Sequence, residues 1–171
     1  MALCAGVGGL EVALDLVFGS AYATVCYVER EAFVAADLVA RMDEGILRPA
    51  PIWSDLDTFD GRRWRGCVDI LTAGFPCQPF SVAGKQAGLD DERWLWPALD
   101  RLIRDVRPGA VFVENVPPIL LHGLTNILRT VADLRFAAEW GRVSAADVGA
   151  SHGRDRFFLL AVADAGRAEW W

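Results

Sequence analysis

Short apolar runs that suit buried strands alternate along the chain with longer segments whose apolar residues recur at helical spacing. The helical spacing covers residues 10–18, 32–42, 94–106 and 123–134. The strand candidates are residues 1–5, 24–28, 52–54, 68–73, 110–114, 135–144 and 157–163. Because two parallel strands are joined by a crossover that is usually a helix, this alternation predicts a doubly wound, mostly parallel sheet with helices on both faces. We therefore expect one α/β domain over residues 1–171, with ligands bound at the carboxyl ends of its strands.

Composition narrows the class of protein. The 171 residues are 53% hydrophobic, which supplies one sizeable core but is short for two. We expect no metal site, because the four cysteines form no C-x-x-C pair and both His122 and His152 are isolated. We expect a cytoplasmic protein outside the membrane, since no apolar run could span a bilayer and the N-terminus lacks a signal-peptide pattern. The net charge of −6 offers no basic surface that would grip nucleic-acid phosphates unaided.

A glycine-rich turn joins the first expected strand to the first expected helix. Residues 5–9 read Ala-Gly-Val-Gly-Gly, and glycines there let the backbone turn tightly and approach a ligand closely. Glu29 ends the second strand, where a carboxylate can accept both ribose hydroxyls of a nucleoside cofactor, and Asp55 ends the third, near a possible adenine amine. Glu11 stands where the dinucleotide pattern G-x-G-x-x-G needs a third small residue. S-adenosylmethionine therefore fits this loop better than a dinucleotide does.

The loop after the strand at residues 68–73 holds a thiol between two prolines. Pro76 and Pro79 fix the backbone on either side of Cys77, so its sulfur has few directions in which to point. A thiol at the carboxyl end of a strand is a candidate nucleophile. An inert buried cysteine is the alternative, and it is the commoner role of a free thiol.

Charged side chains stand beside two further strands. Glu114 closes an apolar strand, and its protonated form could donate to a ring nitrogen, whereas the alternative is an ordinary exposed carboxylate. Arg154 and Arg156 alternate ahead of the last strand, so both can lie on one face of the extended chain. Such a pair could hold a phosphate or carboxyl group, although a solvated pair at the sheet edge is the alternative.

Together these motifs resemble the DNA cytosine-5 methyltransferase family. The resemblance rests on G-F-P-C-Q-P-F-S-V-A-G-K-Q at residues 74–86, Glu-Asn-Val at residues 114–116 and His-Gly-Arg-Asp-Arg at residues 152–156. It implies a Rossmann-like methyltransferase fold, S-adenosylmethionine as cofactor, and methylation of a cytosine flipped out of duplex DNA. The implied catalytic residues are Cys77, Ser81, Glu114, Arg154 and Arg156. The implied cofactor-binding residues are Gly6, Val7, Gly8, Gly9, Glu29, Asp55, Leu56 and Pro76.

The resemblance also implies a role for individual side chains. Cys77 matches the family's nucleophile for carbon 6 of cytosine, and Glu114 matches the residue that hydrogen-bonds ring nitrogen 3. Arg156 matches the contact to the base near its carbonyl oxygen. Cys4 and Arg30 stand where many relatives carry aromatic residues, which is expected to weaken cofactor binding.

The family's target-recognition region and closing sequence blocks have no counterpart in these 171 residues. We therefore expect the catalytic part of a split enzyme, with an incomplete sheet and with recognition supplied by a second polypeptide. Two alternatives stay open, namely a cofactor-binding remnant without activity and an enzyme that methylates a free cytosine nucleotide. The intact set of catalytic residues favours an enzyme.

Overall fold

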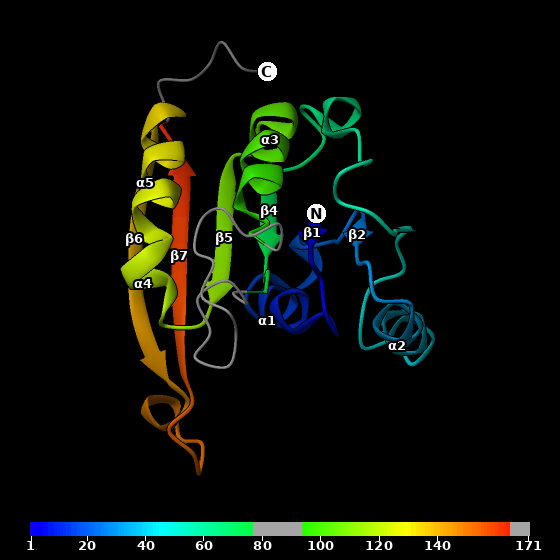
Figure 1. The fold of residues 1–171 in the computed structure, drawn as a ribbon. Helices are drawn as coiled ribbons and strands as arrows, with labels where there is room; N and C mark the ends of the chain where they lie inside the picture. The colour runs from blue at the N-terminus through cyan, green and yellow to red at the C-terminus, as the bar shows by residue number, and fades with distance from the viewer. Residues whose placement is uncertain (77–93, 165–171) are drawn as a thin grey trace.

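The computed structural model describes residues 1–76 and 94–164, so two of the expected catalytic residues, Cys77 and Ser81, lie outside the described residues. Seven strands form one sheet in the order β3-β2-β1-β4-β5-β7-β6 (Figure 1). The strands are β1 (Ala2–Leu3), β2 (Tyr27–Val28), β3 (Ile52–Trp53), β4 (Ile70–Ala73), β5 (Ala110–Asn115), β6 (Phe136–Ser144) and β7 (Asp155–Ala163). Strands β1 to β5 pair in parallel, and β7 runs antiparallel between β5 and β6. The expected mostly parallel sheet is confirmed.

Within residues 1–76 and 94–164, five α-helices join these strands: α1 (Gly9–Phe18), α2 (Ala32–Asp43), α3 (Trp96–Val106), α4 (Ile119–His122) and α5 (Leu124–Asp133). The sequence predicted four of them and missed α4, which is a single four-residue turn too short for a periodic signal. The strand expected at residues 24–28 is shorter in the structure, because only Tyr27 and Val28 pair with the two-residue strand β1. The last strand begins at Asp155 rather than at residue 157, since Ser144 and Asp155 still pair across β6 and β7.

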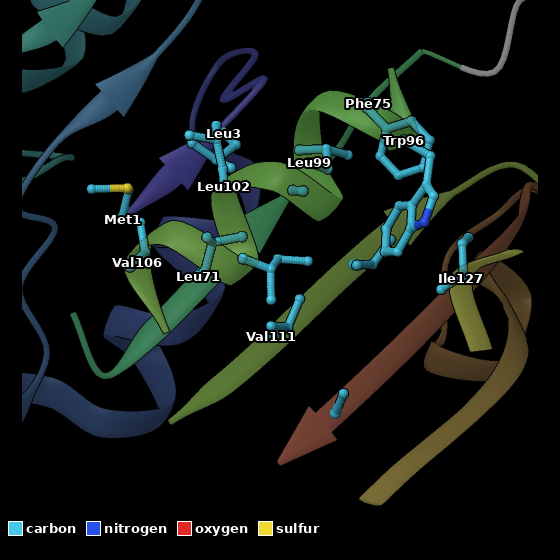
Figure 2. Close-up of a cluster of buried hydrophobic side chains, with 14 of the residues drawn as sticks. Met1, Leu3, Leu71, Phe75, Trp96, Leu99, Leu102, Val106, Val111 and Ile127 are labelled. Carbon is cyan, nitrogen blue, oxygen red and sulfur yellow. The ribbon is translucent and has the colours of Figure 1, made fainter. Parts of the chain in front are cut away.

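One face of the sheet carries the main core. Leu99, Leu102 and Val106 of α3 follow helical spacing and are fully buried against the strands. Figure 2 shows them beside Leu71 of β4 and Val111 of β5. This packing fixes the lengthwise position of β4 and β5, and with it the point at which each strand ends.

The other face carries a smaller core beneath α1 and α2. Tyr27 of β2 and Leu38 of α2 are wholly buried there, and Val12 of α1 packs against the same cluster. The Tyr27 hydroxyl donates to the Arg48 carbonyl oxygen at 3.2 Å, which satisfies its polar end. The residues on both faces of β1 and β2 are therefore buried, as a doubly wound sheet requires.

Candidate active site

Two cavities open at the carboxyl ends of the parallel strands. The first, here the β2–β3 cavity, has a volume of about 620 Å³ and is lined by residues that follow β1, β2, β3 and β4. The second, here the β5–β7 cavity, has a volume of about 760 Å³ and lies between the start of α1 and the outer face of β5 and β7. Cys4, Gly6 and Gly74 line both cavities. A ligand that spans the two would therefore pass the ends of β1 and β4.

The glycine loop after β1 turns the backbone into α1. Gly6 has φ 55° and Gly8 has φ 77°, a region that side chains disfavour. A Cβ at Gly8 would lie 2.6 Å from Leu47 Cδ1, so Gly8 is needed for close packing rather than for lining a cavity. Gly6 lines both cavities, whereas Val7 and Gly9 line only the β5–β7 cavity. Of the four loop residues expected to bind cofactor, the structure thus brings three to a cavity wall.

Glu29 anchors the loop to the end of β2. Its Oε2 accepts the Gly6 amide at 2.8 Å, and its Oε1 accepts the Glu31 amide at 2.9 Å. The side chain is nearly buried but reaches the wall of the β2–β3 cavity. Because a carboxylate has about four lone-pair positions, each oxygen can still accept a ligand hydroxyl. Glu29 follows the last residue of β2 and lines a cavity, and its carboxylate also has a structural role that the sequence did not indicate.

The remaining expected cofactor residues also line the β2–β3 cavity. Asp55 Oδ1 accepts the Asp57 amide at 3.0 Å, which orients the carboxylate. Leu56 is buried, and its carbonyl oxygen accepts Arg101 of α3 at 2.8 Å. Pro76 lines the same cavity and is the last described residue before residues 77–93. Arg101 is a site-supporting residue that sequence inspection missed, because nothing local marks its reach to this loop.

The Cys4 thiol faces both cavities without being a nucleophile. Burial, and to a smaller extent the negative charge of Glu29, raises the pKa of Cys4 to about 12. The thiol therefore stays protonated at neutral pH and acts as a small apolar wall between the two cavities.

Glu114 and the arginine pair meet at the β5–β7 cavity. Arg156 Nε lies 2.6 Å from Glu114 Oε1, and another guanidinium nitrogen of Arg156 donates to the Asp155 carbonyl at 2.8 Å. Glu114 Oε2 is 3.5 Å from the position of a Cβ at Gly74, so that oxygen faces the loop that leads to Cys77. Glu114 and Arg154 both line this cavity. The structure therefore brings together three of the expected catalytic residues.

Asn115 is a buried polar residue that the sequence did not single out as a site residue. Its Nδ2 donates to the Phe75 carbonyl at 2.9 Å, and its Oδ1 accepts the Val116 amide at 2.8 Å. The ring of Phe75 in turn lies 5.9 Å from that of Trp96. Asn115 thus ties the end of β5 to the backbone two residues before Cys77. Its signals in the sequence are its place in the Glu-Asn-Val motif at residues 114–116 and its polar side chain at the end of an apolar strand.

Glu11 is a second buried polar residue at the site. Its side chain is 2% exposed, and its Oε1 accepts the Thr72 hydroxyl at 2.6 Å. Burial raises the pKa of Glu11. Both residues line the β5–β7 cavity, so this pair joins α1 to β4 beneath the loop residues that face a ligand.

No group of three or more His, Cys, Asp or Glu side chains within residues 1–76 and 94–164 is arranged to hold a metal ion. In the same part of the chain, no helix combines the length and apolar character needed to cross a bilayer.

Comparison with known proteins adds the following findings. Residues 1–168 match the family model "C-5 cytosine-specific DNA methylase". The type II methyltransferase M.NgoMIV of Neisseria gonorrhoeae is 34% identical over 94% of this chain and 50% of its own length. M.NaeI of Lentzea aerocolonigenes is 30% identical over 94% of this chain and 38% of its own length. The Dnmt2 methyltransferase of S. pombe shares the fold at a TM-score of 0.75 and 18% identity, covering 95% of this chain and 50% of that structure. The chain thus spans half or less of the length of these relatives.

Proposed function

Because the chain belongs to the C-5 cytosine-specific DNA methylase family, we propose that it is the catalytic half of an enzyme that methylates carbon 5 of cytosine in DNA. The observation that carries this proposal is the meeting of two cavities at Cys4, Gly6 and Gly74. The β2–β3 cavity is lined by the carboxylates of Glu29 and Asp55. The β5–β7 cavity is lined by Glu114 and Arg154. A methyl donor in the first would therefore adjoin a base in the second.

S-adenosylmethionine fits the β2–β3 cavity by the chemistry of its donor set. Glu29 offers carboxylate oxygens to the ribose hydroxyls, and Asp55 offers a second carboxylate to the adenine amine. Gly6 leaves the backbone open for close approach where the two cavities join. When bound, the cofactor supplies a methyl group on a positively charged sulfur.

Cys77 is the proposed nucleophile. Its thiolate adds to carbon 6 of cytosine, and the electron pair of the 5,6 double bond moves toward carbon 5, which becomes able to accept a methyl group. Loss of the carbon 5 hydrogen as a proton to water then restores the double bond and expels the thiolate. Proline on either side of Cys77 limits the directions of the sulfur, which favours one approach to the ring.

Glu114 and Arg156 are proposed to stabilise the ring during this addition. With Glu114 Oε1 held by Arg156, the other oxygen is the one available to ring nitrogen 3, and it donates a hydrogen bond there only when the carboxyl group carries a proton. Arg156 is also proposed to contact the base near its carbonyl oxygen, and Arg154, which is exposed and lines the same cavity, would contact a neighbouring phosphate. Ser81 completes the proposed set by its place four residues after Cys77 in the sequence.

Recognition of DNA sequence is proposed to come from a second polypeptide. The net charge of −6 supports this proposal, because a protein that holds a duplex unaided usually carries a clear basic face. A flipped cytosine is the expected substrate, because its carbon 5 and carbon 6 are inaccessible within the stack. A chromosomal substrate supports a cytoplasmic location.

The decisive experiment removes the gene from its host and maps 5-methylcytosine by bisulfite sequencing of the whole genome. We expect methylation at one short recurring sequence to disappear, to return with the unaltered chain, and to stay absent with Cys77→Ala. Cys67→Ala is the matched control, because Cys67 is an exposed thiol that lines neither cavity, and it should restore methylation. Calorimetric titration with S-adenosylmethionine should give the same affinity for the purified Cys77→Ala chain as for the unaltered one.

Restoration of methylation by Cys77→Ala would refute the assigned nucleophile. An unchanged methylation map after gene removal, with cofactor binding intact, would favour a binding remnant. Transfer to free cytidine nucleotides, with no change in the genome, would favour the nucleotide enzyme.

A further inference from the structure

The loop that follows β3 has a cavity on each side of it. Asp55, Leu56 and Asp57 line the β2–β3 cavity, where the methyl donor is proposed to bind. Asp57 also lines a third cavity, here the rear cavity, which has a volume of about 390 Å³ and includes Arg101 of α3 in its wall. Because Asp57 borders both cavities, residues 55–59, here the adenine loop, form a thin wall with open space behind it.

The Arg101 side chain holds the backbone of the adenine loop from the rear cavity. One terminal guanidinium nitrogen donates to the Leu56 carbonyl at 2.8 Å and to the Asp57 carbonyl at 3.4 Å. The other donates to the Phe59 carbonyl at 3.2 Å and to the Asp105 carboxylate at 3.5 Å. Three carbonyl oxygens of one loop therefore share a single donor side chain.

Two hydrogen bonds connect this guanidinium to the carboxylate proposed to meet the adenine. Arg101 donates to the Asp57 carbonyl, and the Asp57 amide donates to Asp55 Oδ1 at 3.0 Å. Leu56, which lies between the two aspartates in sequence, is buried and lines the β2–β3 cavity. A shift of the loop backbone would therefore move both the Asp55 carboxylate and the Leu56 side chain.

The helix that carries Arg101 is itself fixed on the sheet. Leu99, Leu102 and Val106 of α3 are fully buried, and Leu95, which caps the helix, lines the β2–β3 cavity. A side chain that extends from a packed helix holds a site more precisely than contacts within a loop do. The five N–H donors of arginine lie in a rigid fork, so one guanidinium can serve several carbonyls at once.

We propose that Arg101 is the positioning residue that sets the preference of this chain for adenine in its methyl donor. The proposal rests on the proposed function, in which Asp55 accepts the adenine amine. With the loop held, a purine that carries a carbonyl oxygen at carbon 6 would face the Asp55 carboxylate with no hydrogen between the two oxygens. Without Arg101 the loop can shift toward the rear cavity, and the carboxylate no longer distinguishes the two purines.

An ordinary surface ion pair is the competing account of Arg101. Arg101 pairs with Asp105 and Arg104 pairs with Asp100, in both cases four residues apart on α3, and the two arginine side chains are 39% and 43% exposed. They differ in their other contacts, because Arg101 also binds three loop carbonyls, whereas Arg104 lies 4.0 Å from a second carboxylate, that of Asp133. Arg104 is therefore a matched control on the same helix.

Calorimetric titration of the purified chain with two probes tests the proposal. S-adenosylhomocysteine and S-inosylhomocysteine differ at carbon 6 of the purine, which bears an amine in the first and a carbonyl oxygen in the second. We expect the unaltered chain to prefer the adenine probe by at least about 30-fold, and Arg101→Met to reduce this preference to about threefold or less. The affinity of Arg101→Met for the inosine probe should stay within about threefold of the parent, which also shows that the variant is folded. Arg104→Met should keep the full preference.

Two further variants examine the route from the guanidinium to the purine. Arg101→Lys keeps the positive charge but offers its three N–H donors from one atom, which cannot reach the Leu56 and Phe59 carbonyls together, so it should lose the preference as well. Asp55→Asn can present either an oxygen or an amino group to the purine, so it should abolish the preference by itself. Adding Arg101→Met to Asp55→Asn should then have no further effect on the preference, because the arginine acts through this carboxylate.

The outcomes separate this inference from the proposed function. Full preference in Arg101→Met or Arg101→Lys, an equal loss in Arg104→Met, or an equal fall in affinity for both probes would overturn the positioning role. A preference lost in Asp55→Asn but kept in Arg101→Met would overturn the inference alone. A full preference in Asp55→Asn would overturn the assignment of Asp55 to the adenine, which belongs to the proposed function. Failure of the unaltered chain to bind either probe would overturn the proposed cofactor site and the inference with it.

Discussion

Glu29→Gln tests the double role that the structure gives to this carboxylate. In the folded chain both of its oxygens accept backbone amides, from Gly6 at 2.8 Å and from Glu31 at 2.9 Å. Glutamine keeps the length of the side chain but offers one oxygen and one amino group. One backbone amide therefore loses its acceptor and faces a donor, while the other keeps a neutral hydrogen bond in place of a charged one.

The size of the effect follows from these two contacts. A hydrogen bond to a charged group contributes about 1.5–3 kcal/mol, and a neutral one about 1 kcal/mol. Losing one bond and weakening the other should lower the free energy of unfolding by about 2–3 kcal/mol, which corresponds to roughly 4–10 °C in Tm for a domain of this size. The ribose loses one of its acceptors as well, so the affinity for S-adenosylmethionine should fall by about 10- to 100-fold.

Urea denaturation and calorimetric titration measure the two effects separately. Glu44→Gln is the control, since Glu44 is an exposed carboxylate at the end of α2, and it should change neither quantity beyond about 0.5 kcal/mol. Unchanged stability with lost affinity would show that the two backbone bonds contribute little. Unchanged affinity with lost stability would refute the assignment of Glu29 to the ribose.

Three further substitutions test other parts of the site. Asn115→Leu removes the hydrogen-bond partners of the Phe75 carbonyl and the Val116 amide. It should lower the free energy of unfolding, measured by urea titration, by about 2–4 kcal/mol and should reduce genomic methylation. A fully stable variant would contradict the anchoring role. Gly8→Ala should lower the free energy of unfolding by about 2 kcal/mol, because φ is 77° and the new Cβ would lie 2.6 Å from the buried Leu47 side chain. Gly9→Ala, in open space at the start of α1, should raise it by about 0.5–1 kcal/mol. Equal effects of the two substitutions would argue against the loop geometry. For Glu11, burial raises the folded-state pKa above the unfolded value near 4.5, so the folded state binds more protons and stability falls as pH rises through that value toward the folded pKa. Glu11→Gln should remove this fall, so the stability of the variant relative to the parent should rise between pH 4 and pH 7; parallel pH profiles would show that burial does not raise the pKa of Glu11.

The helices were predictable where apolar residues recur at helical spacing and that apolar side packs against the sheet. Residues 32–42 and 94–106 have helical spacing because Leu38 of α2 and Leu99 of α3 must face the sheet, and both helices form within two residues of the expected bounds. The single turn of α4 and the short pairing of β2 were not predictable, because they depend on where neighbouring strands end rather than on any local pattern.

The sequence predicted at which strand ends the candidate site residues lie, but not which residues they form hydrogen bonds with. Motif order placed Glu29, Asp55 and Glu114 at strand ends, and the structure finds each at a cavity wall. The hydrogen bond from Asn115 to Phe75 and the bond between Glu11 and Thr72 join residues 40 and 61 positions apart. Sequence inspection offers no signal for such pairs.

The α/β class, the family and the strands at whose ends the candidate site residues stand could all be inferred from the sequence alone. These features are written in short-range periods and in motif spacing, which survive without knowledge of neighbours. Three features required the folded structure. Glu114 forms an ion pair with Arg156, and the Glu29 carboxylate accepts hydrogen bonds from two backbone amides. One face of β7 is buried, whereas the other is partly exposed to solvent. The physical reason is that burial and hydrogen-bond partnership depend on which segments meet across the sheet, and side-chain alternation along a strand is the same whether or not a layer lies above it.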